Sequence, residues 1–261
     1  MGAPAASSVS NKATISGGST VTLTSQFVLG SAASSKGELH IENARMHAVT
    51  GMVARMNNTS GTLSIINSTY TGTNLHVGGG ALTNSNGNAT VAITGSSLSV
   101  TNVNVGFGSG STTVFTMTNS TMSGNNNLTI SAGTSSSASF NMYGGSYSVS
   151  GLRLGAGRNS TASVYLNGNA VLQGDFMQMG RDGTSAQSIY ASGTSQLIFD
   201  TGSSNAVLIG NGTGHTNTVS LTEGASANFA VAYTHVGGAS NNTTISMTDT
   251  SSWVMSYKAV S

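Results

Sequence analysis

The stretch Asn88-Ala-Thr-Val-Ala-Ile-Thr-Gly-Ser-Ser-Leu-Ser-Val100 decides the fold. Apolar and polar residues alternate on both sides of a Gly-Ser-Ser turn, which is the period of two expected of half-buried strands. Shortly before it stands Leu75-His-Val77-Gly78, an aliphatic anchor closed by a small residue. The same three pieces recur along the chain: an anchor, an alternating segment and a weaker apolar segment.

The anchors recur roughly every 25 residues. They are Leu29, Val77, Val105, Ile130, Leu154, Met179, Ile209 and Val236, with a weaker copy near Val53. Antiparallel hairpins would place turns at about half this period, and no unit contains the apolar stripe of a helix. A parallel β-solenoid fits, because equivalent residues of successive coils then stack in columns about 4.8 Å apart.

The repeat predicts the core and the domain limits. We expect an all-β solenoid of about ten coils with three strands each, right-handed by the general crossover rule. It should span residues 13–257, after a lead-in of residues 1–12 and before a tail of residues 258–261. Two inward columns are predicted. They are Leu39/Leu63/Val91/Phe115/Phe140/Val164/Ile189/Val219/Ile245 and Ile41/Ile65/Ile93/Met117/Met142/Leu166/Ala191/Leu221/Met247.

The composition excludes several classes of protein. Charged residues make up 6% of the chain, cysteine is absent, and no charged residue occurs from Met56 to Leu152. Coiled coils, disulfide scaffolds and cysteine metal sites are therefore excluded. A net charge of +1 without a basic stripe also excludes electrostatic binding of nucleic acid. No apolar run is long enough for a transmembrane helix.

Two segments carry a family resemblance, Leu75-His-Val-Gly-Gly-Gly80 with its following strands and His235-Val-Gly-Gly-Ala-Ser240 followed by Thr244-Ile-Ser-Met-Thr-Asp-Thr-Ser-Ser-Trp253. The pattern resembles the β-helical passenger repeats of bacterial autotransporters and related exported repeat proteins, from roughly Ala13 to Tyr257. The resemblance implies an extracellular or cell-surface protein that is a fibre or adhesin-stalk subunit. Since such passengers include adhesins and proteases, it does not fix the function.

Two carboxylates are the candidates for catalysis. Asp175 and Asp200 are separated by one repeat, so a solenoid could stack them about 5 Å apart. That spacing suits glycosidic cleavage or a calcium site, and a polysaccharide-degrading enzyme is one alternative function. The simpler interpretation is a pair of solvated turn residues, and we expect no enzymatic activity, no cofactor and no metal.

Aromatic and basic residues suggest a second alternative, a glycan- or surface-binding adhesin module. Tyr165 and Tyr190 occupy the same outward position in neighbouring coils, and Arg153 and Arg181 lie near the same coils. Exposed tyrosines can contact a sugar ring, although an aromatic ladder that stabilises the sheet is the simpler explanation. The five histidines show no metal-ligand spacing and are all expected at the surface.

The ends of the repeat suggest self-assembly. The first coil, with Ile15, Val21 and Leu23, is as apolar as an internal coil, and no capping helix is indicated. The last strand carries Trp253, Met255 and Tyr257. We therefore expect subunits to stack head to tail into filaments, with the chain itself or other surface and matrix components as partners. The alternative is a piece of a longer passenger.

Overall fold

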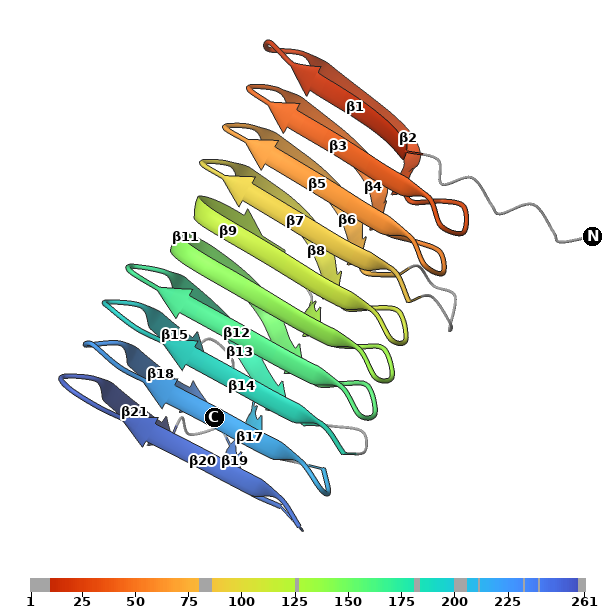
Figure 1. Ribbon diagram of the computed structural model, residues 1–261. Helices are drawn as coiled ribbons and strands as arrows, with labels where there is room; N and C mark the ends of the chain where they lie inside the picture. The colour runs from red at the N-terminus through yellow and green to blue at the C-terminus, as the bar shows by residue number, and fades with distance from the viewer. Residues whose placement is uncertain are drawn as a thin grey trace, which may run out of the picture.

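The computed structural model describes residues 10–79, 86–124, 127–180, 184–199, 206–210, 212–231, 233–238 and 240–257. These residues form a parallel β-solenoid of about nine turns, about 25 residues apart, and they contain no helix. The predicted fold class is therefore confirmed. Figure 1 shows the turns stacked in chain order, with β1 at one end and β20 and β21 at the other.

The first stack of strands carries the alternating segments of the sequence. Each strand pairs in parallel with the equivalent strand of the turns before and after it. The members are β1 (Ser10–Ser16), β3 (Lys36–Glu42), β5 (Ser60–Ile66), β7 (Asn88–Thr94), the first part of β9 (Thr112–Ser123), the first part of β11 (Ser137–Leu154), β12 (Thr161–Asn167), β14 (Ala186–Ala191), β17 (Thr216–Leu221) and β20 (Asn242–Met247).

The second stack carries the weaker apolar segments and the anchors. It contains the later parts of β9 and β11 together with β2 (Thr20–Leu29), β4 (Arg45–Val53), β6 (Thr69–Val77), β8 (Ser97–Val105), β10 (Asn127–Ile130), β13 (Val171–Met179), β15 (Gln196–Phe199), β16 (Ala206–Ile209), β18 (Ser226–Val231), β19 (Tyr233–Val236) and β21 (Ser252–Tyr257). In β4, β6, β8 and β13 the weaker segment and the next anchor form one continuous strand, where separate strands were expected.

The core consists of the predicted columns. Val91 lies between Leu63 and Phe115, and every other step of both first-stack columns also matches the observed register. The anchors pile in a single file as well, and Val53 fills the place of the weak copy between Leu29 and Val77. A thin apolar strip therefore runs through the whole molecule, which explains how so few apolar residues suffice.

The corner between the two stacks repeats one backbone conformation. In every turn one residue in the same column has φ between 45° and 74°. This left-handed region is open to glycine and is tolerated by Asn and Asp, which accounts for every residue type found there except Glu223. The column consists of Gly17, Asn43, Asn67, Gly95, Asn119, Gly144, Gly168, Gly193, Glu223 and Asp249.

Serine hydroxyls form hydrogen bonds with backbone groups of this corner in successive turns. The Ser96 hydroxyl accepts a hydrogen bond from the Ser68 backbone N–H at 3.1 Å and donates to the Thr94 carbonyl at 2.8 Å. The Ser120 hydroxyl does the same for the Ser96 N–H at 3.2 Å and for the Thr118 carbonyl at 2.8 Å. These buried backbone groups are thereby satisfied across successive turns, and the corner is fixed in register.

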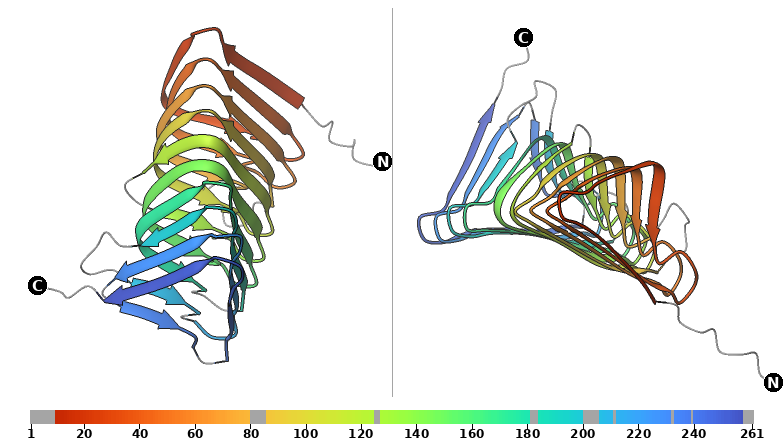
Figure 2. Two further views of the ribbon diagram at one scale, coloured as in Figure 1. Left: turned by 90° about the vertical axis from the view of Figure 1, so that its left-hand side faces the viewer. Right: turned by 90° about the horizontal axis from the view of Figure 1, so that it is seen from above.

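The corner that leads back to the first stack uses hydroxyls differently. The side chains of Ser111, Ser136 and Ser160 each donate to the carbonyl oxygen three residues earlier, at 2.6–2.8 Å. Each hydroxyl closes a tight turn from within. Figure 2 shows the turns following one another along a single axis, so that corners and faces of successive turns line up.

Candidate functional site

The two carboxylate candidates are not seen to form a site. Asp175 is half-buried inside β13, in the middle of a continuous strand, and Asp200 lies outside the described residues. Within the described part of the chain, no group of three or more His, Asp or Glu side chains could hold a metal ion. The catalytic interpretation of this pair therefore gains no support from the geometry.

Tyr165 and Tyr190 form a ladder on the outer face of the first stack. They are register partners on β12 and β14, and their rings stack with centroids 5.1 Å apart at an interplanar angle of 15°. The contact forms a ladder between neighbouring turns, and both tyrosines are still more than a third exposed. The ladder explains their stacking, and contact with a sugar ring stays a prediction.

Arg153 does not join the tyrosines. Arg153 lies in the second-stack part of β11, between Thr129 and Gln178, while the tyrosines belong to the first stack. Its guanidinium carbon lies 5.9 Å from the centre of the Phe176 ring, a cation–π arrangement. Arg181 lies outside the described residues. The four residues expected at one ligand surface are thus not observed together.

The outer face of the second stack carries polar ladders that the sequence did not suggest. The Asn102 amide donates to the Asn74 side-chain oxygen at 3.0 Å, and the Asn104 amide nitrogen lies 3.1 Å from His76 Nδ1. The His76 ring also stacks on Phe107 with centroids 4.7 Å apart. Burial lowers the pKa of His76 below its ordinary value. These contacts link neighbouring turns through their side chains.

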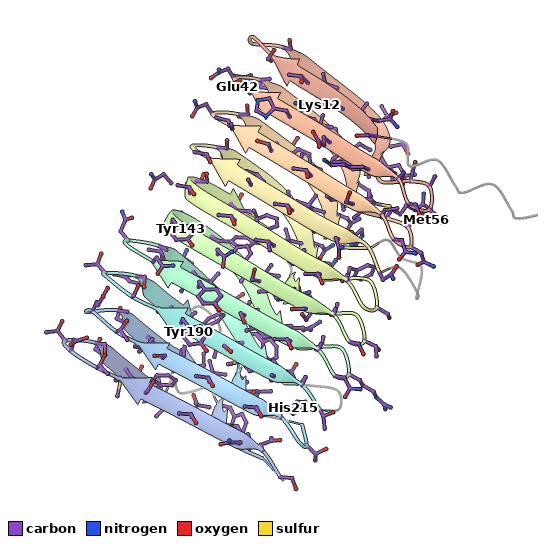
Figure 3. All side chains as sticks on the ribbon, viewed as in Figure 1. Lys12, Glu42, Met56, Tyr143, Tyr190 and His215 are labelled. Carbon is purple, nitrogen blue, oxygen red and sulfur yellow. The ribbon has the colours of Figure 1, made fainter. Side chains whose placement is uncertain are left out.

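The expectation that all histidines are at the surface is wrong for His215. Its side chain is 1% exposed, and its Nδ1 lies 2.8 Å from the Ser185 hydroxyl. His215 occupies the corner position that serine holds in most turns, and its backbone N–H donates to Asn241 Oδ1 at 2.8 Å. Figure 3 labels His215 at this corner. A histidine this deeply buried has no access to substrate, so the Ser185–His215 contact is a packing feature.

The N-terminal edge of the solenoid exposes part of its core. The β1 and β2 strands pair only with β3 and β4 among the described residues. Ile15, Val21 and Leu23 are half-buried. Their register partners one turn inward, Ile41, Met46 and Ala48, are 0–3% exposed.

The C-terminal edge exposes its apolar residues more strongly. Met247 is 51% exposed and Met255 is 59% exposed, whereas their partners Leu221 and Phe229 are fully buried. Trp253 is half-buried against the core and meets the Phe229 ring edge to face at 4.8 Å. Tyr257 pairs through its backbone with Val231, and its side chain lies outside the described part.

The charges separate along the rod. The described part of the first turns carries Lys12, Lys36, Arg45 and Arg55 against Glu38 and Glu42. Lys36 Nζ lies 2.7 Å from Glu38 Oε1, and this contact lowers the pKa of the Glu38 carboxyl. At the other end the described residues 216–257 contain Glu223 and Asp249 and no Lys or Arg. The described residues of the two ends therefore carry opposite net charge, and Lys258 follows β21 in the sequence.

Comparison with other proteins does not assign the chain to a family. No protein-family model, no curated protein and no solved structure matches the chain. The resemblance to autotransporter passengers extends, on this structure, only to the β-helical repeat itself. Among the described residues no helix is long and apolar enough to cross a membrane. The feature from which a function can be proposed is therefore the pair of exposed edges, β1 and β2 at one end and β20 and β21 at the other.

Proposed function

We propose that the protein is a structural rod that lengthens by head-to-tail stacking, as a fibre or stalk subunit of an extracellular or cell-surface assembly. The role is mechanical, and no catalytic chemistry is assigned to it. The extracellular setting rests on the resemblance of the repeats to exported passengers. The stacking rests on the two edges of the solenoid.

The observation that carries the proposal is the exposure of core columns at their last members. Among the described residues, Ile245 and Met247 are the last members of columns whose preceding members, Val219 and Leu221, are fully buried. Solenoid edges are normally protected by a charge, a proline or a covering segment. Strand β20 contains neither a charged residue nor a proline. Another coil stacked on it would bury its apolar side chains and pair the backbone N–H and C=O groups on its outer side.

The near-neutral flanks of the rod direct association to its ends. Residues 56–152 carry no charge and present mainly Ser, Thr and Asn outward, as at Ser99 and Thr112. Such side chains are well solvated, and among the described residues of this stretch the exposed large apolar side chains are Val114 and Tyr143. The exposed apolar residues of the last turns, Val236, Ile245, Met247, Val254 and Met255, are instead gathered at one end.

A charge placed on the edge tests the proposal. Wild-type protein should show mass that grows with concentration in analytical ultracentrifugation, and elongated particles in negative-stain images. Met247→Lys should remain folded and sediment as a monomer, because the ammonium group would be buried in the contact. The matched control is Thr112→Lys, which puts the same charge on the exposed flank and should assemble normally.

Two results would overturn the proposal. One is wild-type protein that stays monomeric at all concentrations tested. The other is assembly that survives Met247→Lys but is lost in Thr112→Lys, which would move the contact from the edge to the flank. Circular dichroism of both variants separates loss of contact from loss of fold.

A further inference from the structure

We infer that successive subunits join in one specific register, with β20 of one copy on β1 of the next and β21 on β2, so that every column continues across the boundary. This inference rests on the proposed head-to-tail stacking and specifies its contact. The partner is a second copy of this chain.

The column positions of the first and last turns match without insertion or deletion. Tracing the observed pairings from β1 to β20 puts Asn242 in the column of Ser10. Tracing them from β2 to β21 puts Ser252 in the column of Thr20. Both steps have the same offset in sequence, so one placement of the next copy aligns both strands together.

This placement puts apolar side chains on apolar side chains. In the first stack Met247 comes to lie on Ile15, and in the second stack Met255 comes to lie on Leu23. The same offset sets Ile245 on Ala13 and Trp253 on Val21. All eight residues stand in columns that are buried one turn inward. A shift by one residue would put these side chains against outward columns instead, because side chains alternate along a strand.

The corner between the stacks continues as well. Asp249 has φ of 59° and Gly17 has φ of 69°, so both belong to the same left-handed column. A Cβ built on Gly17 or Gly18 would meet no heavy atom within 4 Å, which leaves room for the turn of the next copy. The corner geometry repeated through the rod is therefore available on both sides of the boundary.

Charge supports the same arrangement. The aligned turn brings Asp249 to the corner where Gly18 and Arg45 line an open hollow of about 590 Å³. Thr244 comes over Lys12, so no like charges meet in a column. Opposite charges on the two ends steer encounter and disfavour contact between two identical ends. The polarity of the stack follows from this pairing.

Cysteine trapping tests the register directly, because the chain contains no cysteine. Thr14 and Ser246 stand in the same outward column, and the inference sets them opposite each other across the boundary. Register partners in neighbouring strands have Cα atoms about 4.8 Å apart, within the range of a disulfide. The double variant Thr14→Cys/Ser246→Cys, mildly oxidised, should give a ladder of dimers and higher multimers on a non-reducing gel, collapsed by reductant.

The matched control shifts one cysteine by two residues on the same face. In Thr14→Cys/Thr244→Cys the two Cα atoms would lie about 8 Å apart, beyond disulfide reach, so little ladder should form. If filaments are seen in micrographs but the shifted pair gives a stronger ladder than the aligned pair, the proposed register is wrong. Dimers from Ser246→Cys alone would overturn the polarity. Absence of both ladder and filaments would overturn the proposed function itself.

Discussion

At the scale of single residues, the left-handed corner column is the feature on which the turns depend. It recurs in every turn and is filled mostly by Gly and Asn. The sequence marks this column through Gly and Asn residues that follow each alternating segment at a fixed distance. The apolar periodicity does not mark it, because the column is defined by backbone conformation and contains no apolar side chains.

Gly168 is the position at which the backbone cost of a side chain at positive φ can be measured alone. It has φ of 68°, and a Cβ there would meet no atom within 4 Å, so only the backbone opposes a side chain. Gly168→Val should lower the free energy of unfolding by about 1–2 kcal/mol, and Gly168→Asn by clearly less, because Asn tolerates this region. Urea denaturation of both variants measures the difference. Equal losses for Val and Asn would contradict the conformational explanation.

Burial of polar residues was the least predictable property at this scale. The core columns follow from alternation and were predicted residue by residue. His215 was not, because a polar residue at a corner looks like any solvated turn residue until its neighbours are known. Its burial depends on Ser185 and Asn241, which are distant in sequence and reach it only through the stacking of turns.

At the scale of elements, ladders between equivalent strands stabilise the outer faces. The Tyr165–Tyr190 pair is the clearest aromatic case, and it was anticipated as a ladder or as a sugar platform. Spacing in the sequence could not choose between the two, because both need the same outward column. The stacked rings fit the ladder, and the sugar platform stays a prediction.

The ladder predicts coupling between the two tyrosines. A double-mutant cycle with Tyr165→Ala and Tyr190→Ala should give an interaction free energy of roughly 0.5–1 kcal/mol in urea denaturation. The cycle of Tyr143→Ala with Tyr190→Ala should be additive, because Tyr143 stands in the column of Asn167. Strict additivity of the first pair would show that the stacking contributes nothing.

The second-stack ladder predicts a pH dependence of stability. Burial lowers the pKa of His76 from the ordinary value of 6.5, so the folded protein resists protonating it. As the pH falls through that value, the unfolded chain binds a proton there and the folded chain does not, so stability decreases. When the pH is lowered from about 7.5 to about 5.5, the urea concentration at the unfolding midpoint should decrease more in wild type than in His76→Asn. Asn can still accept from Asn104, and an identical pH response in both proteins would contradict this role.

The merging of segments into long strands also belongs to the element scale. Three strands per coil were expected from three apolar segments, yet β4 runs unbroken from Arg45 to Val53. Within it, Gly51 lets the backbone pass close to Phe27, where a Cβ would come within 2.6 Å of the ring. Whether neighbouring apolar segments merge into one strand leaves little trace in an apolar pattern.

At the scale of the whole molecule, the arrangement of the rod follows from the repeat, and its ends suggest its use. The sequence predicted apolar edges with six residues, and the structure places all six in the strands β1, β2 and β21: Ile15, Val21, Leu23, Trp253, Met255 and Tyr257. Met247 and Ile245 were predicted only as core members. They are exposed because, within the described part of the chain, β20 pairs with β17 alone.

Electron cryomicroscopy of the assembled chain tests the stacking account most directly. The first stack has one strand at each of ten levels, from β1 to β20. With strands about 4.8 Å apart, uninterrupted stacking predicts a filament that rises about 48 Å per subunit, with the spacing preserved across the boundary. Dispersed single rods, or filaments in which the subunits touch through their flanks with another rise, would contradict the account.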